Sequence, residues 1–143
     1  MLINLTQFAR SEEKDPKTPI LSAIGHAIGD ITLMGGDVLV ATYVEPEKTK
    51  GGVYMPETRL SESRWQGKSG LVLAMGHDAF RWFEEGQPYE GPKPSIHDWV
   101  FYRASDSWEI CLCPDSKSNK GYSVRMIADK DIKGILSRPD LIY

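Results

Sequence analysis

The sequence is poor in cysteine, and this scarcity limits what the protein can be. Its only cysteines, Cys111 and Cys113, lie two apart in an expected strand, which would place them on one face about 7 Å apart. That distance is too long for an easy disulfide, and two thiols are too few for a metal site. We interpret them as small core residues, with a redox role as the lesser alternative.

Long hydrophobic runs and an excess of positive charge are also missing. No apolar run approaches the roughly 18 residues that a membrane span needs, and the N-terminus lacks a charged segment followed by an apolar one. The net charge is -3, so we expect no nucleic-acid partner. The length of 143 residues fits one domain with additions. We expect a cytoplasmic protein or, alternatively, a component of a virion.

Catalytic and cofactor-binding patterns are missing as well. No Ser/His/Asp or Cys/His set stands out, and the glycine pairs at 35–36 and 51–52 do not form the Gly-x-Gly-x-x-Gly fingerprint of a dinucleotide domain. The adjacent pairs at 77–78 and 97–98, each His-Asp, are typical of turns. We expect a protein that is not an enzyme and that has no cofactor or metal.

Residues 1–35 are expected to form an N-terminal arm. Residues 11–19 are charged and interrupted by proline, whereas Ile20, Ile24 and Ile28 follow at the spacing of a small amphipathic helix. These three isoleucines are candidate interface residues, because the arm should dock either on its own domain or on a neighbouring subunit.

Residues 36–136 have the pattern of an all-β barrel domain, which a tail at 137–143 follows. Runs of β-branched and aromatic residues between glycine- and proline-rich turns indicate several short strands. The strand at 108–113 is expected to be the hairpin partner of the strand at 99–102. Further strands are expected at 38–44, 67–76 and 122–127, with a helical turn or terminal strand at 129–136.

The polar loop 45–68, between the first two strands, contains an apolar triplet. Two glycines before the triplet leave the backbone loose, and the proline after it stops a helix or a central strand. Such a patch is typical of a partner surface, and the alternative is a short edge strand that folds back on its own domain. The residues of this segment are Gly51, Gly52, Val53, Tyr54, Met55 and Pro56.

The insertion 77–95 is rich in aromatic residues. Its composition is that of a loop, but it has too many aromatic rings to be left in water. We expect it to pack on itself or on a neighbouring subunit. Its secondary interface candidates are Phe80, Trp82, Phe83 and Tyr89.

The order of these features resembles the GroES-type co-chaperonins. The first strand is followed by a loop with Gly-Gly-apolar-apolar-apolar-Pro-acidic-Thr, here 51–58. The next strand resembles Gly-x-x-Val-x-Ala-x-Gly and ends at Gly76. The strand at 97–102 resembles Gly-Asp-x-Val-x-Phe/Tyr, with His97 in place of the glycine, and 126–136 resembles the family's apolar-acidic-Asp-Ile-x-x-Ile ending.

This resemblance implies a β-barrel subunit of a seven-membered homo-oligomeric ring, which caps a chaperonin and assists ATP-dependent protein folding. In that family the loop, here about 47–66, is mobile until its apolar triplet enters a groove between helices of the chaperonin rim. The matching residues are Val53, Tyr54 and Met55. The divergence of the sequence would suit a co-chaperonin encoded by a phage.

Two departures from the family support a second hypothesis. The arm of about 35 residues precedes the first strand, and the insertion 77–95 is longer and more aromatic than the family's small roof hairpin. The second hypothesis is a non-enzymatic structural protein with a GroES-like barrel. An example is a decoration or cement protein of a viral capsid, attached through its arm and loops.

Overall fold

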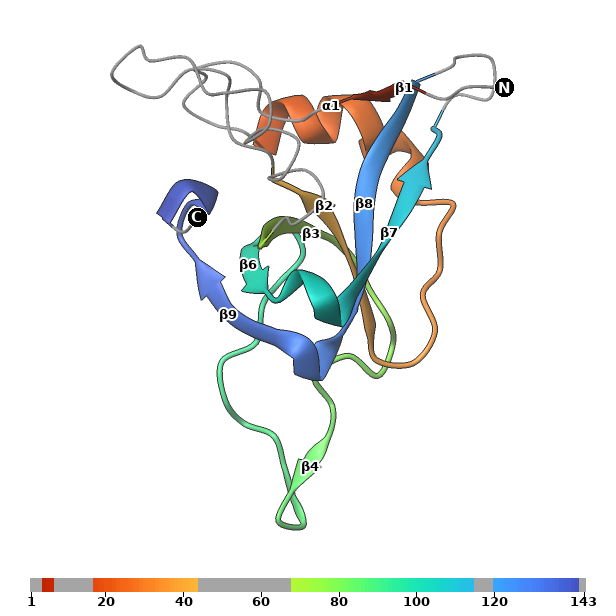
Figure 1. The fold of residues 1–143 in the computed structure, drawn as a ribbon. Helices are drawn as coiled ribbons and strands as arrows, with labels where there is room; N and C mark the ends of the chain where they lie inside the picture. The colour runs from red at the N-terminus through yellow and green to blue at the C-terminus, as the bar shows by residue number, and fades with distance from the viewer. Residues whose placement is uncertain (1–3, 7–16, 44–67, 115–119, 142–143) are drawn as a thin grey trace.

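A computed structural model describes residues 4–6, 17–43, 68–114 and 120–141 of the chain (Figure 1). These residues are mostly β-sheet with one short α-helix. The elements are β1 (Asn4–Thr6), α1 (Lys17–Ile28), β2 (Asp37–Thr42), β3 (Ser69–Met75), β4 (Phe83–Glu84), β5 (Gln87–Pro88), β6 (Trp99–Tyr102), η1 (Ala104–Asp106), β7 (Ser107–Leu112), β8 (Lys120–Ala128), η2 (Asp129–Asp131), β9 (Ile132–Leu136) and η3 (Pro139–Leu141).

Seven of the strands form one sheet, and all its pairings are antiparallel except that of β1 with β8. Its order is β1-β8-β2-β3-β6-β9, and β7 also pairs with β8. The predicted pairing of the first two strands is confirmed, because β2 and β3 are antiparallel neighbours. The small β4–β5 sheet stands apart from the large one.

Four of these strands make a long bent ribbon, with β6 and β7 on one side and β8 and β9 on the other. Tyr102 faces Ile132 before the bend, and Ser107 faces Ile127 after it, so the same antiparallel register continues across the bend. A register shift separates Phe101 from Tyr102 in the β6–β9 half. The turns η1 and η2 lie at the bend (Figure 1). We call this unit the bent ribbon.

The prediction that 108–113 is the hairpin partner of 99–102 is wrong. β7 pairs with β8, whereas β6 pairs with β3 and β9. The chain bends between β6 and β7 and does not reverse its direction there.

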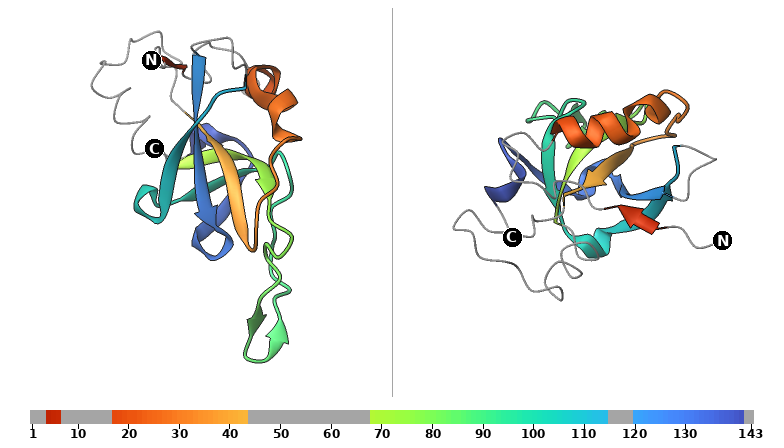
Figure 2. Two further views of the ribbon diagram at one scale, coloured as in Figure 1. Left: turned by 90° about the vertical axis from the view of Figure 1, so that its right-hand side faces the viewer. Right: turned by 90° about the horizontal axis from the view of Figure 1, so that it is seen from above.

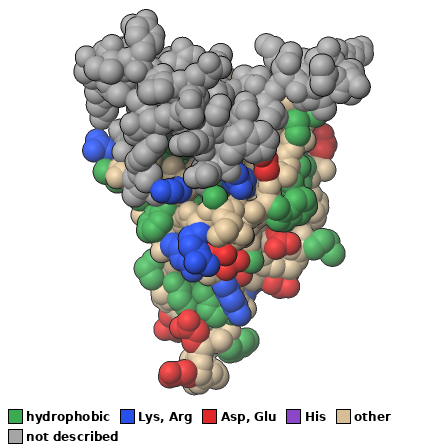
Figure 3. All heavy atoms as spheres, in the orientation of Figure 1, with side chains coloured by type: hydrophobic (Ala, Val, Ile, Leu, Met, Phe, Trp, Pro, Cys, Tyr) green, Lys and Arg blue, Asp and Glu red, His purple; other side chains and the backbone are tan. Residues whose placement is uncertain are grey.

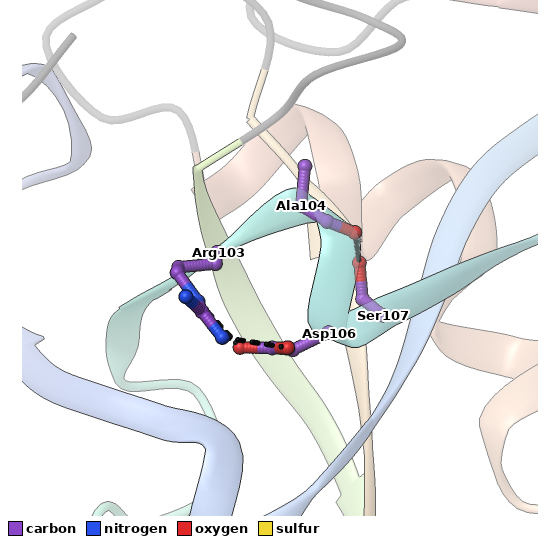
Figure 4. A network of polar contacts seen from close by, with 4 residues as sticks. All are labelled: Arg103, Ala104, Asp106 and Ser107. Atoms are coloured by element: carbon purple, nitrogen blue, oxygen red, sulfur yellow. Dashed lines mark hydrogen bonds and ion pairs between the residues drawn. The ribbon is translucent and has the colours of Figure 1, made fainter.

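Polar contacts stabilise this bend at η1. Arg103 donates hydrogen bonds to both carboxylate oxygens of Asp106, at 2.8 and 3.2 Å, and Ser107 Oγ donates to the carbonyl of Ala104 at 2.8 Å (Figure 4). The hydrogen bonds from Arg103 lower the pKa of Asp106.

The predicted barrel is also wrong, because the sheet is not closed. Within the described residues, β7 has β8 as its strand partner and β9 has β6, so each keeps one outer edge without a strand. Both strands belong to the bent ribbon, in which β7 pairs with β8 and β9 pairs with β6. The sheet therefore bends over without joining its edges (Figure 1).

Both faces of the central strands are buried. Along β2, Leu39 and Ala41 face helix α1, while Val38 and Val40 face the opposite side, as the alternation of a strand requires. The helix-side core consists of Ile20, Ile24, Leu39, Ala41, Leu71, Leu73, Trp99 and Val124. The inner core consists of Val38, Val40, Val72, Phe80, Val100, Tyr102 and Ile127.

Helix α1 is the predicted amphipathic helix of the arm, and it covers the outer face of the chain's own sheet (Figure 2). Pro19 lies in its first turn, where a missing backbone N–H costs little. Ile20 and Ile24 are one helical turn apart and both are 0% exposed. Of the two alternatives for the arm, docking on its own domain therefore holds for this helix.

Replacement of Ile24 by alanine should lower the free energy of unfolding by about 2–5 kcal/mol, because it leaves a cavity between α1 and the sheet. Urea denaturation measures this change. Ser22→Ala, at an exposed position of the same helix, is the matched control and should change stability by less than about 0.5 kcal/mol. Equal effects of the two substitutions would contradict the packing of α1.

Candidate functional site

The predicted partner-binding segment, 51–56, lies outside the described residues. The structure does define the place where its loop leaves the sheet. Thr42 at the end of β2 faces Gly70 at the start of β3, and the next residue, Tyr43, donates its N–H to the carbonyl of Ser69 at 3.0 Å. The loop thus begins and ends at neighbouring positions. We call Tyr43, Lys68, Ser69, Gly70 and Tyr102 the loop root.

Backbone and side-chain contacts hold the loop root against the rest of the fold. The N–H of Tyr102 donates to the carbonyl of Lys68 at 2.9 Å, and its hydroxyl donates to the carbonyl of Ser69 at 3.4 Å. Ser69 Oγ in turn donates to the carbonyl of Pro139 at 3.4 Å. The Tyr43 ring meets Trp99 edge to face, with the ring centroids 5.9 Å apart. Both ends of the loop are therefore attached to buried parts of the sheet.

Tyr102 is the most deeply buried ionisable group of the loop root. Burial raises the pKa of its phenol above the ordinary value, and the positive charge of nearby Arg125 offsets part of this rise. The hydroxyl therefore stays protonated at neutral pH and remains a hydrogen-bond donor. In the structure this donor is used on the carbonyl of Ser69, which ties β6 to the loop root.

The second candidate site is the aromatic hairpin, which comprises residues 77–95 with β4 and β5 (Figure 2). It projects from the end of the molecule opposite α1. Glu85 and Gly86 connect its two strands, both with positive φ (51° and 81°), as a tight two-residue hairpin turn requires. The projecting end carries acidic and hydrophobic side chains (Figure 3).

The four predicted aromatic residues of this hairpin have different environments. Phe80 is buried in the inner core, at 5% exposure. Trp82 and Tyr89 stack across the hairpin with centroids 4.5 Å apart, and Tyr89 N donates to the carbonyl of Trp82 at 2.8 Å. Phe83, by contrast, is 70% exposed. The insertion therefore packs on its own domain at its base and presents one phenylalanine near its tip.

Two residues of η2 brace the base of the hairpin. Asp129 Oδ2 accepts a hydrogen bond from the N–H of Phe80 at 2.8 Å. Lys130 Nζ lies 5.9 Å from the centroid of the Trp82 ring, within the range of a cation–π contact. Sequence reasoning missed both residues, because nothing in the sequence shows that 129–130 lies beside residues 80–82.

The isoleucines of the arm serve the core of their own chain. Ile20 and Ile24 are fully buried against the sheet, and Ile28 packs partly buried against the same cluster. Neither Ile20 nor Ile24 is available to a neighbouring subunit while α1 stays in place. The spacing of the isoleucines correctly indicated a buried helix face, but spacing cannot say which surface covers that face.

The interpretation of the cysteines as core residues is wrong. Cys111 and Cys113 are both exposed, and their sulfur atoms are only 3.9 Å apart. β7 ends at Leu112, so Cys113 lies outside the strand. The regular spacing of strand residues therefore does not apply to this pair. The short Cys-x-Cys spacing was the available signal for this contact.

Among the described residues, no group of three or more His, Cys, Asp or Glu side chains is placed to hold a metal ion. No helix in this part of the chain is long and apolar enough to cross a membrane. In comparisons with known proteins, no family model and no curated protein matches the sequence.

Gly70→Ala tests the close packing of the loop root. A Cβ atom at Gly70 would lie 2.9 Å from the carbonyl oxygen of Ala41 and 3.0 Å from Cβ of Val40, so we expect a loss of about 1–3 kcal/mol in unfolding free energy. Gly29→Ala is the control, because a Cβ there meets no atom within 4 Å. Denaturant titration of both variants measures the difference, and an unchanged Gly70→Ala protein would show that the two strand ends are not held this closely.

Proposed function

We propose that the protein is a co-chaperonin subunit, which caps a chaperonin through the apolar triplet Val53, Tyr54 and Met55 and assists ATP-dependent protein folding. The observation that carries this proposal is the loop root. A long polar loop with one apolar triplet leaves and re-enters the sheet at adjacent positions, Thr42 and Gly70, of two buried strands. A partner that binds the triplet would therefore be coupled to a rigid framework.

The backbone before β6 also supports the resemblance to co-chaperonins. His97 has a φ of 73°, in the left-handed region that favours glycine, and it occupies the position where the family pattern has glycine. Ser95 N donates to Asp98 Oδ2 at 2.8 Å, and Asp98 N donates to the carbonyl of Ser95 at 3.0 Å. The chain thus forms a tight turn at this point, with a histidine in the position where the family pattern has glycine.

The energetics of such a loop favour a weak and reversible contact. Burial of each apolar side chain of the triplet contributes about 1.5–3 kcal/mol. Ordering each loop residue costs on the order of 1 kcal/mol, so a single loop would bind weakly. We propose a homo-oligomeric ring, because several loops on one ring raise the overall affinity while each contact can still release.

The combined substitution Val53→Ser, Tyr54→Ser and Met55→Ser should abolish retention of the protein on an immobilised chaperonin in the presence of ATP. Chaperonin-dependent refolding of a substrate protein should be lost as well, because the loop no longer has apolar area to bury. The matched control is Thr49→Ser, Thr58→Ser and Gln66→Ser, which changes three polar residues of the same loop. If the triplet variant still caps and supports refolding, the loop is not the binding element.

A second candidate function is that of a structural protein, such as a decoration protein of a viral capsid. The observation that favours it is the aromatic hairpin, which projects from the sheet with Phe83 exposed and acidic residues Glu84 and Glu85 beside it. A braced projection with an exposed aromatic ring suits contact with another protein, since aromatic residues are enriched at such interfaces. The roof of a hydrophilic folding chamber, as in a co-chaperonin, would not require an exposed aromatic ring.

The second function predicts that the protein co-sediments with assembled viral shells when no chaperonin is present. Phe83→Ser should abolish this co-sedimentation and leave thermal unfolding unchanged, because the ring is 70% exposed. Gln87→Ser, an exposed position on the opposite strand of the hairpin, is the control. Retention on chaperonin with ATP, without co-sedimentation, would reject the second function in favour of the first.

A further inference from the structure

The two cysteines form an exposed dithiol where β7 ends. Cys111 lies in β7, one residue before the end of this strand, and Cys113 follows the strand. Both side chains are exposed, and their Sγ atoms are 3.9 Å apart, close enough for one thiol to donate a weak hydrogen bond to the other. Neither sulfur belongs to a buried cluster, so packing in the core does not explain the pair.

The geometry permits a bond between these sulfurs at the expense of some strain. A disulfide needs the sulfurs at about 2.05 Å, so they must approach by roughly 2 Å. Cys113 lies beyond the end of β7, so the pair is not held at the spacing of a regular strand. The last ladder pair of β7 is Leu112 with Tyr122, so Cys113 can move without breaking a strand pairing. The resulting bond would be strained, and strained, exposed disulfides are easily reduced.

We propose that Cys111 and Cys113 form a redox-active dithiol that exchanges reversibly with small-molecule disulfides such as oxidised glutathione. The proposal does not depend on the co-chaperonin function. β7 has strand pairing only with β8 among the described residues, so the dithiol lies on an edge strand. It would connect the redox state of the surroundings to the conformation of the ribbon's end.

The exchange proceeds in two balanced steps. A protein thiol loses its proton, and the thiolate attacks one sulfur of the small disulfide, which forms a mixed disulfide and releases one thiolate. The second protein thiol loses its proton and attacks the protein sulfur of the mixed disulfide, which closes the Cys111–Cys113 bond and releases the second small thiolate. Both released thiolates take up the protons. The dithiol is oxidised by two electrons, and the small disulfide is reduced.

The surroundings of Cys111 indicate the order of attack. Partial burial, the hydrogen bond with Cys113 and the negative charges of Cys113 and Glu109 all raise the pKa of the Cys111 thiol. A thiol with a raised pKa has little thiolate at neutral pH and attacks slowly. Cys113 lies beyond Leu112, the last paired residue of β7, so we expect it to attack the small disulfide first and Cys111 to close the bond.

Exposure of the fully reduced chain to oxidised glutathione, followed by thiol alkylation and intact-mass measurement, tests the proposal. The expected product is a monomer that takes up no alkylating reagent, is lighter by two hydrogen atoms, and returns to the dithiol with dithiothreitol. Cys111→Ser should lose this product and accumulate one glutathione adduct on Cys113. Cys113→Ser should also lose it and form its adduct more slowly than Cys111→Ser does.

Two outcomes would overturn the proposal. The first is a wild-type protein that accumulates two glutathione adducts, because the cysteines would then react independently. The second is a disulfide-linked dimer as the main product on a non-reducing gel, because the bond would then form between chains. Circular dichroism of both serine variants verifies that they fold, which is expected because both positions are exposed.

Discussion

Burial of the central strands on both faces is the constraint on which the rest of the structure depends. β2 and β3 turn alternate side chains toward helix α1 and toward the inner core, so neither face of these strands is open to a partner. The exposed features of the described residues lie at the periphery of this sheet. Among the described residues, these include the tip of the aromatic hairpin, the dithiol and the outer edges of β7 and β9.

The bent ribbon connects these peripheral parts to one framework. Tyr102, on one side of the ribbon, holds the loop root through its N–H and its hydroxyl. Asp129 and Lys130, in the turn on the other side, brace the aromatic hairpin. Because the two sides share one register across the bend, the loop root and the hairpin are set at defined positions on the same unit. Either proposed function would use this rigidity to present a projecting segment to a large partner.

Local patterns were sufficient for the longer elements of the sheet and for helix α1, but not for the short strands β1, β4 and β5 or for the strand partners. The spacing of Ile20 and Ile24 predicted a helix with a buried face, and runs of β-branched and aromatic residues predicted β2, β3, β6 and β8. The period-two alternation of 108–113 also predicted a strand correctly. It could not show that the chain bends at η1 and pairs with β8, since alternation describes the faces of a strand and not its neighbours. The expectation of a closed barrel was wrong for the same reason, because closure depends on which strands pair and alternation does not show this.

The sequence by itself determined helix α1, the strands β2, β3, β6, β7 and β8, the pairing of β2 with β3 and the position of the polar loop between them. It did not reveal β1, β4 or β5. Only the tertiary structure decided that α1 covers the outer face, that Phe80 is buried while Phe83 is exposed, and that the cysteine sulfurs touch. The physical reason is that propensity and periodicity act over a few neighbouring residues. Burial and contact depend on which distant segments meet, as Asp129 meets Phe80, and a single sequence contains no local signal for such pairs.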